Sequence, residues 1–285
     1  MFEIQWLWLI LMGLGTGIYG VLVGAGGGFI LAPLLLIFFH KDPAMVAGTV
    51  LALVAVNSIS GAITFGRMGI VDKRSAYLFA AAAIPGSVIA PFILKALVKG
   101  SPGLFHILFG VILLLLAIRI LTKQKSDAAE QQPQSAPVTL PDTKLVRSRT
   151  IISKRGQTYK YRFNEGSATA INFVLGFISS FFGIGGGFLR TPILIYGFGF
   201  PVQVAVATSI FTLAFPATAG ALTHAWLGHV DFFPTFVLAG AGLIVGGQIG
   251  AKLTGVVKDQ WIMRLLLLVV FILGISLMIQ GFTGL

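Results

Sequence analysis

The chain of 285 residues has no cysteine and few charged side chains. The lack of cysteine excludes disulfides, thiolate metal sites and cysteine nucleophiles together. Charged residues make up 10% of the chain, whereas a soluble domain usually has about 25%. Hydrophobic residues make up 56%, and the mean hydropathy is +0.94. This composition predicts an integral membrane protein.

Acidic side chains are especially scarce, and all nine fall in expected loops or at the ends of apolar segments. They are Glu3, Asp42, Asp72, Asp127, Glu130, Asp142, Glu165, Asp231 and Asp259. We therefore expect no buried carboxylate that could hold a cation or relay protons, which disfavours cation transport. The sequence also shows no spacing of metal ligands and no nucleophile paired with a base. We expect no metal, no cofactor and no enzymatic activity.

Eight apolar segments divide the chain, at residues 5–39, 45–66, 76–98, 103–122, 167–199, 203–227, 233–255 and 261–282. Six of them have the length of one membrane-spanning helix, which needs about 20 residues. The first and the fifth are longer than 30 residues, and each would extend about 50 Å as one straight helix. We expect an all-α membrane protein in which these two segments are interrupted.

The two over-long segments carry matching glycine clusters, each followed by a proline. Residues 24–35 read GAGGGFILAPLL, and residues 183–194 read GIGGGFLRTPIL. Glycine weakens a helix, so clusters deep in apolar sequence need an explanation. Either backbones pack very closely there, as small residues allow in membranes, or the helix is broken at a binding site. Because both clusters lie in the over-long segments, we favour breakage.

The match between the two halves extends beyond the clusters, at a constant offset of 159 residues. Thr49, for example, matches Thr208. Self-similarity at a fixed offset indicates a duplicated unit. We expect two repeats, at residues 1–122 and 167–285, each with four segments of which the first is broken or re-entrant.

The linker at residues 123–166 holds nine of the 20 Lys and Arg residues. A basic cluster beside membrane spans usually faces the cytoplasm and anionic lipid, so we expect no nucleic-acid partner despite the net charge of +11. Residues 126–137 lack a core-forming pattern and should be disordered. Residues 149–163 alternate around a turn and predict a short β-hairpin. We interpret the linker as a solvated basic loop rather than a regulatory module.

The distribution of Lys and Arg favours inverted repeats. If each over-long segment crosses the membrane once, 13 basic residues lie inside and six outside. If each is a re-entrant hairpin, the repeats are inverted and the count becomes 16 inside and three outside, leaving out Arg190. Positive charge gathers on the cytoplasmic side, so we expect the inverted arrangement with both termini outside. A kinked full span is the alternative for the first segment.

Broken helices would free backbone N–H groups at the start of each second half-helix. These donors and the positive helix end attract anions, and glycine lets an anion approach closely. We therefore predict an anion site at the two clusters, closed by a phenylalanine from each. Its members are Gly24, Gly26, Gly27, Gly28 and Phe29 in the first repeat and Gly185, Gly186, Gly187 and Phe188 in the second.

Arg190 is the single charged residue inside a glycine-cluster segment, and the first repeat has Leu31 at that position. An arginine at membrane depth is a functional candidate, and a guanidinium group pairs with an oxyanion through two hydrogen bonds. The alternative is an arginine that snorkels to the surface or caps backbone carbonyl groups. We expect Arg190 to supply the charge that opposes the anion.

Further polar candidates lie in the segments that follow the clusters. Asn57, Thr208 and Ser209 could add side-chain contacts, although such residues more often form interhelical hydrogen bonds. The first repeat has Val50 opposite Ser209, so a hydroxyl role there would be one-sided. His224 is a candidate for proton coupling because histidine titrates near neutrality.

The glycine clusters with Pro33 and Pro192, together with Thr49 and Thr208, resemble the sulfite exporter TauE/SafE family, also called the toluene sulfonate uptake permease family. The resemblance covers essentially everything except residues 123–166. It implies a bacterial or archaeal inner-membrane transporter of about eight hydrophobic segments. Its substrates would be sulfur-containing anions such as sulfite or sulfonates.

Together these features predict a secondary transporter of a small oxyanion, working by alternating access around a midplane site between the repeats. We expect a lipid bilayer, a small anionic substrate, a coupling ion (a proton or sodium) and a homodimeric partner. The alternatives are an anion channel, and a membrane receptor or assembly factor that acts through the basic linker.

Overall fold

The computed structural model describes residues 2–39, 42–100, 102–129, 145–154, 156–253 and 259–283. The first half contains α1 (Phe2–Leu22), α2 (Gly28–Phe39), α3 (Pro43–Met68), α4 (Lys73–Gly100) and α5 (Pro102–Ala129). A hairpin of β1 (Val146–Ile152) and β2 (Thr158–Asn164) follows. The second half contains α6 (Glu165–Phe182), α7 (Gly187–Pro192), the π-helix η1 (Ile193–Gly197), α8 (Val202–Trp226), the π-helix η2 (Phe232–Phe236), α9 (Val237–Leu253) and α10 (Asp259–Thr283).

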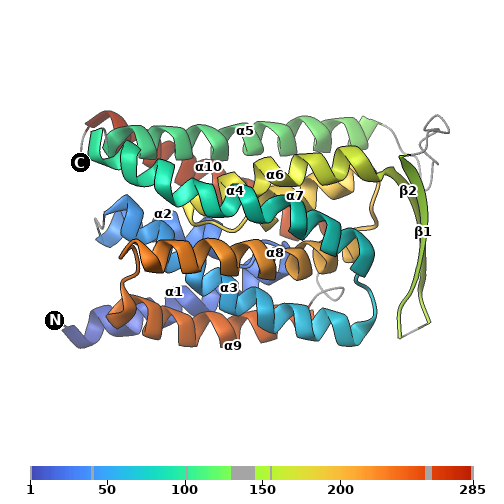
Figure 1. Ribbon diagram of the computed structural model, residues 1–285, viewed down its shortest axis with the longest axis horizontal. Coiled ribbons are helices and arrows are strands. Elements are labelled where there is room, and N and C mark those ends of the chain that lie inside the picture. The colour runs from blue at the N-terminus through green and yellow to red at the C-terminus, as the bar shows by residue number, and fades with distance from the viewer. Residues whose placement is uncertain are drawn as a thin grey trace.

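The helices lie along the long axis of the molecule and interleave the two halves (Figure 1). In the centre, α3 packs against α8. Around this pair, α1 packs against α9, α4 against α6, and α5 against α10. Each contact joins a helix of the first half to one of the second. The core is therefore shared between the halves.

Five helices of the described chain are long and apolar enough to cross a membrane, and α3 and α8 are the most buried of them. They span Gln5–Leu22, Pro43–Met68, Lys73–Leu97, Val202–Trp226 and Phe232–Leu253. Three shorter apolar helices cover Gly28–Phe39, Gly103–Leu115 and Leu267–Thr283. The protein is thus a multi-pass membrane protein whose membrane part is all-α, as the composition predicts.

Both over-long segments are broken at their glycine clusters. The first is divided between α1 and α2, and the second between α6 and the pair formed by α7 and η1. Figure 1 shows that α2 returns to the end of the molecule where α1 begins. Both chain termini lie at that end, and the hairpin lies at the opposite end.

The hairpin packs against the bundle, so the interpretation of the linker as a solvated loop is wrong for this part. β1 and β2 pair in antiparallel register, with Ser148 opposite Arg162. Tyr161 and Phe163 are buried, and their ring centroids lie 4.4 Å and 4.7 Å from that of Phe200. The alternation of the strand therefore points aromatic side chains at the bundle, where they bury apolar surface.

The start of the linker also differs from the prediction. α5 continues to Ala129, so the first residues of the stretch at 126–137 are helical and not disordered. The rest of that stretch lies outside the described residues.

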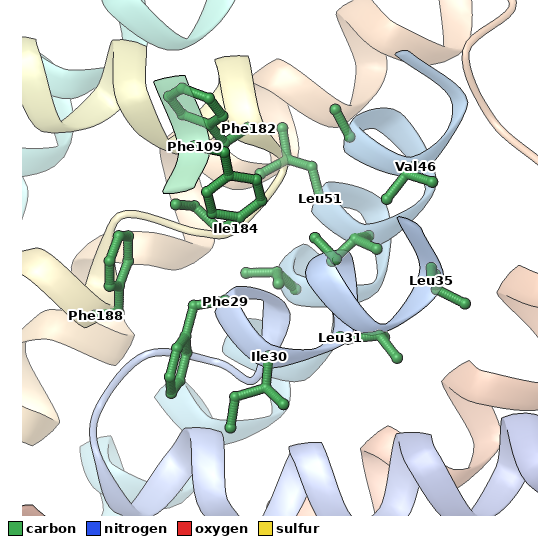
Figure 2. Close-up of a cluster of buried hydrophobic side chains, with 14 of the residues drawn as sticks. Phe29, Ile30, Leu31, Leu35, Val46, Leu51, Phe109, Phe182, Ile184 and Phe188 are labelled. Atoms are coloured by element: carbon green, nitrogen blue, oxygen red, sulfur yellow. The ribbon is translucent and has the colours of Figure 1, made fainter. Parts of the chain in front are cut away.

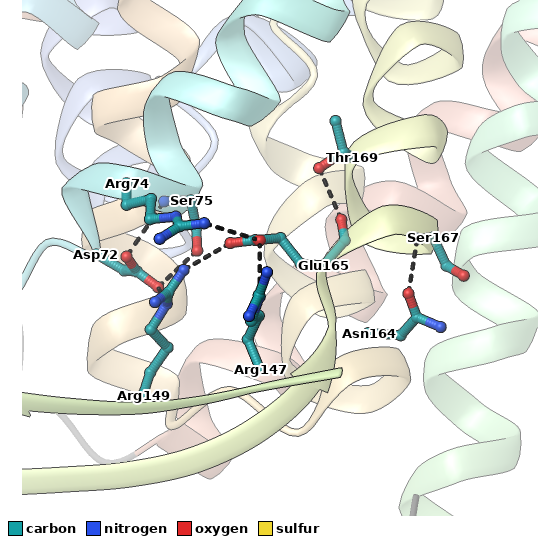
Figure 3. A network of polar contacts seen from close by, with 9 residues as sticks. All are labelled: Asp72, Arg74, Ser75, Arg147, Arg149, Asn164, Glu165, Ser167 and Thr169. Carbon is teal, nitrogen blue, oxygen red and sulfur yellow. Dashed lines mark hydrogen bonds and ion pairs between the residues drawn. The ribbon is translucent and has the colours of Figure 1, made fainter. Parts of the chain in front are cut away.

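A network of charged side chains fastens the hairpin to the bundle (Figure 3). Arg149 donates to Glu165 at 2.6 Å, and its Nε lies 3.5 Å from Oδ2 of Asp72. Asp72 also accepts hydrogen bonds from the hydroxyl groups of Tyr161, at 2.8 Å, and Ser75, at 2.6 Å. Burial, and next Asp72, raise the pKa of Tyr161, which therefore stays a donor.

This network corrects the expectation that no carboxylate is buried. Asp72 is only 3% exposed, because the hairpin covers the connection between α3 and α4. Its charge is opposed by Arg149 and its oxygen atoms accept several donors, which makes burial tolerable. Asp72 therefore has a role in holding the hairpin.

We predict that Arg149→Ala lowers the free energy of unfolding by about 2–3 kcal/mol, because Asp72 loses Arg149 as its ion-pair partner and Glu165 loses its donor at 2.6 Å. Denaturant unfolding in detergent micelles would measure the change. Arg147→Ala is the matched control, since the Arg147 side chain is 50% exposed and lies 3.6 Å from Glu165. It should cost less than about 1 kcal/mol. Equal losses for the two variants would contradict this account.

Candidate functional site

The candidate site lies where two glycine-rich turns meet, between α1 and α2 and between α6 and α7. Five glycines of these turns have positive φ angles, a backbone conformation that residues with a Cβ atom rarely adopt. They are Gly24 (79°), Gly26 (74°), Gly27 (92°), Gly183 (69°) and Gly185 (69°). Glycine is therefore required for the breaks themselves.

The same glycines let the two turns touch. A Cβ atom on Gly28 would lie 2.8 Å from the carbonyl oxygen of Ile184, and one on Gly187 would lie 2.9 Å from Cα of Ala25. Contacts this short cannot form, so a larger residue at either position would push the turns apart. The sequence left open whether the clusters serve close packing or breakage, and they serve both.

Phe29 and Phe188 stack on each other beside the turns (Figure 2). Their ring centroids lie 5.7 Å apart with an interplanar angle of 7°, and both side chains are fully buried. Each ring belongs to a different half of the chain. The two phenylalanines therefore form one aromatic contact that joins the half-helices α2 and α7.

Arg190 is the central chemical feature of the site. Its side chain is 1% exposed, and Nε donates a hydrogen bond of 2.6 Å to Oδ1 of Asn172 on α6. Nη1 and Nη2 are buried, and neither has a hydrogen-bond partner among the described residues. An unpaired buried charge is costly, so the two terminal nitrogens are donors available to a ligand. The burial also argues against a snorkelling arginine.

The second turn is supported by serine and threonine side chains that the sequence analysis did not identify. Ser179 accepts a hydrogen bond of 2.7 Å from the amide of Gly186. The hydroxyl group of Thr191 donates to the carbonyl oxygen of Gly24, at 3.3 Å, and so ties the two turns together. At the repeat offset of 159 residues, the first half has Gly20 opposite Ser179. This difference between the halves is the one feature of the sequence that could have pointed to Ser179.

The first turn has neutral polar neighbours on α3. Nδ2 of Asn57 donates to the carbonyl oxygen of Gly26 at 3.0 Å. Oδ1 of Asn57 and the hydroxyl group of Ser58 are buried without a partner in the described part of the chain. Asn57 thus lies at the first glycine turn, and Ser58 lies beside it, 3.1 Å from the position of a Cβ atom on Gly26.

Thr208 and Ser209 differ in their surroundings. The hydroxyl group of Thr208 accepts the amide hydrogen of Asp72 at 3.1 Å. Thr49, its counterpart, accepts the amide hydrogen of Asp231 at 2.8 Å. The two threonines therefore form matched contacts. Thr208 of α8 contacts the first half, and Thr49 of α3 contacts the second half. The hydroxyl group of Ser209 is buried and lacks a partner within the described ranges.

His224 lies on α8 next to α6. Its Nε2 is 2.9 Å from the carbonyl oxygen of Ser180, and its Nδ1 is 3.3 Å from Nδ1 of His229. Among the residues that the structure describes, no three His, Cys, Asp or Glu side chains gather as a metal site.

The model of the family described as "Sulfite exporter TauE/SafE" matches residues 9–277 of the chain. The chain belongs to the TauE/SafE family. The match includes both glycine turns, Asn57 and Arg190. It agrees with the resemblance that the glycine clusters suggest.

Relatives of the TauE/SafE chain are named as membrane transporters. The probable membrane transporter protein YunE of Bacillus subtilis (strain 168) is 29% identical over 280 residues, which cover 96% of this chain and 97% of the relative. The probable membrane transporter protein MJ0441 of Methanocaldococcus jannaschii is 21% identical, with 95% and 94% covered. Sulfite exporter TauE/SafE family protein 5 of Arabidopsis thaliana is 31% identical over 38% of this chain and 28% of its own. No solved structure matches the chain significantly.

We predict that Gly185→Ala destabilises this TauE/SafE protein. The positive φ angle costs about 1–2 kcal/mol for alanine, and the new Cβ atom would lie 2.6 Å from Cγ1 of Val54. Gly15→Ala is the matched control, because no atom lies within 4 Å of a Cβ atom placed on this exposed residue of α1. It should stabilise the helix by up to about 1 kcal/mol. Thermal unfolding in detergent compares the midpoint temperatures of the two variants. A midpoint of Gly185→Ala at or above that of Gly15→Ala would refute the prediction.

Proposed function

We propose that this protein is a secondary transporter that moves small sulfur-containing oxyanions, sulfite or an organosulfonate, by alternating access. The observation that carries the proposal is the buried guanidinium group of Arg190, whose two terminal nitrogens lack a partner in the described chain. A planar pair of N–H donors matches two oxygens of a sulfite or sulfonate group. The description of the family as sulfite exporters supports the same class of substrate.

The neutral groups at the glycine turns would orient the anion without competing for it. The half-helices α2 and α7 begin at the glycine turns, where backbone amides and the positive helix end favour an anion. Asn57 and Ser58 offer further buried polar atoms beside the first turn. A site with one arginine and many uncharged donors should prefer anions to cations.

Alternating access would use two halves of similar build that move around this site. Two sets of matched contacts support the similar build of the halves. α1 contacts α9 as α6 contacts α4, and the Thr208–Asp72 contact has its counterpart in the Thr49–Asp231 contact. These matched contacts support inverted repeats, a recurrent design of secondary transporters. The coupling ion would be a proton or sodium.

The inverted arrangement predicts where the chain ends lie. The basic linker at residues 123–166 would be cytoplasmic and both termini would lie outside the inner membrane, because positive charge gathers inside. The position of both termini opposite the hairpin supports this orientation.

We predict that alkaline phosphatase, a reporter that is active only outside the cytoplasm, is active when it is fused after Leu285. A cytoplasmic C-terminus would refute the inverted arrangement.

We predict that Arg190→Gln lowers sulfite flux into reconstituted vesicles by about 100-fold, because the anion loses its charged partner. The substrate-free variant should stay as stable as the parent, since it removes a buried charge that has no ion partner. Arg67→Gln, at an exposed position near the end of α3, is the control and should transport normally. Near-normal flux through the Arg190 variant would remove Arg190 from the site. Thiosulfate, sulfoacetate and taurine should be tested in the same assay.

The same vesicles distinguish a carrier from an anion channel. A carrier saturates, and labelled substrate inside speeds the uptake of substrate from outside. A channel would instead carry current without a coupling-ion gradient and exceed carrier rates.

The receptor or assembly-factor alternative requires the hairpin to bind a partner. Its Tyr161 and Phe163 side chains are already packed against Phe200 of its own bundle.

A further inference from the structure

Two buried histidines face each other at the end of α8. His224 is fully buried, and His229 is 9% exposed in the connection between α8 and η2. Their Nδ1 atoms lie 3.3 Å apart. The amide of His229 donates to the carbonyl oxygen of His224 at 2.9 Å, which fixes the two residues relative to each other. This geometry places a direct hydrogen bond between the imidazole rings.

The surroundings determine where the hydrogen atoms of the neutral pair lie. Nε2 of His224 is 2.9 Å from the carbonyl oxygen of Ser180, which can only accept a hydrogen bond, so this nitrogen carries a hydrogen. Nδ1 of the neutral His224 ring is then an acceptor. The hydrogen between the rings must therefore come from Nδ1 of His229, which leaves Nε2 of His229 without a hydrogen.

We propose that the His224–His229 pair is a site for one transported proton. The proton binds to Nε2 of His229, and His229 then carries a hydrogen on both nitrogens. Its Nδ1 hydrogen is donated to Nδ1 of His224, so that the two rings share the charge through this hydrogen bond. A second proton cannot bind while the rings keep this contact, since both Nδ1 atoms would then carry hydrogens that point at each other.

The charged groups around the pair permit loading and release. Burial, and next Lys95 of α4, lower the pKa of His229, whereas Asp42 at the start of α3 raises it. Asp231 lies two residues further along, and its carboxylate accepts a hydrogen bond from Thr235 at 2.7 Å. Burial and Lys95 therefore favour release of the proton, and Asp42 favours its uptake, as a site that exchanges its proton at every cycle requires.

The pair is linked to the proposed anion site through two adjacent serines of α6, and its role in coupling rests on that proposed function. Ser180 receives the hydrogen bond of His224, and its neighbour Ser179 accepts the amide of Gly186 in the turn before Arg190. A charge shared by the pair thus lies beside the segment of α6 that supports the second turn. A bound proton and a bound anion would each lower the cost of burying the other.

The pair has no equivalent in the other half of the chain. The positions 159 residues earlier are Phe65 and Ile70, both buried and apolar. Proton binding would therefore occur once per transport cycle and at one end of the bundle, the end that holds the chain termini.

The tautomers test the proton site without any substrate. Histidine labelled with ¹³C and ¹⁵N in the full-length protein, in lipid nanodiscs, should show His229 as the Nδ1–H tautomer and His224 as the Nε2–H tautomer at high pH. The pair should take up one proton as the pH falls. His224→Gln should shift the titration of His229, whereas the control His106→Gln should leave the pair unchanged. Two independent titrations, or the opposite tautomers, would overturn the proposal.

Flux measurements test the coupling. In vesicles with labelled sulfite, His224→Gln should lower the ratio of pH-gradient-driven accumulation to equal-pH exchange by about tenfold. His106→Gln should keep the parent ratio. An unchanged ratio in His224→Gln would overturn the coupling role. If the parent protein moves no sulfite at all, the proposed function fails, while the tautomer measurement still decides whether the pair is a proton site.

Discussion

A helix that breaks inside a bilayer leaves backbone N–H and C=O groups that water cannot reach, and the structure depends on how these groups are satisfied. Here the two breaks are placed against each other and against α3 and α6. Asn57 donates to Gly26, and Ser179 accepts from Gly186. Glycine at the contact allows backbones to approach to distances that any side chain would prevent. Helices α3 and α6 therefore hold the two breaks in place.

The two breaks are alike in backbone and unlike in chemistry. The second half has Arg190 and Asn172, and the first half has Leu31 and Gly13 at the same positions of the repeat. The structure brings Arg190 and Asn172 into direct contact at 2.6 Å. One half therefore supplies charge, and the other supplies neutral polar atoms from α3. An anion bound between them would contact both halves, which is the arrangement that alternating access needs.

The sequence predicted the features that depend on local pattern and length. The breaks follow from apolar segments too long for one span, and the hairpin follows from alternation around a turn. Features that depend on long-range packing were missed. The burial of Asp72 requires the hairpin to fold over it, and the contact of Thr208 with Asp72 joins residues 136 positions apart. The pairing of His224 with His229 likewise requires the loop to fold back on α8. The roles of the site residues remain predictions.

The interleaving of the halves makes each half depend on the other for its burial. α1 packs on α9, and α4 packs on α6, so each half covers apolar faces of the other. A single four-segment unit would leave those faces open. A second copy of the unit could cover them in the same way as the other half does here. In a single chain the two halves need not be identical, so one half can have Arg190 where the other has Leu31.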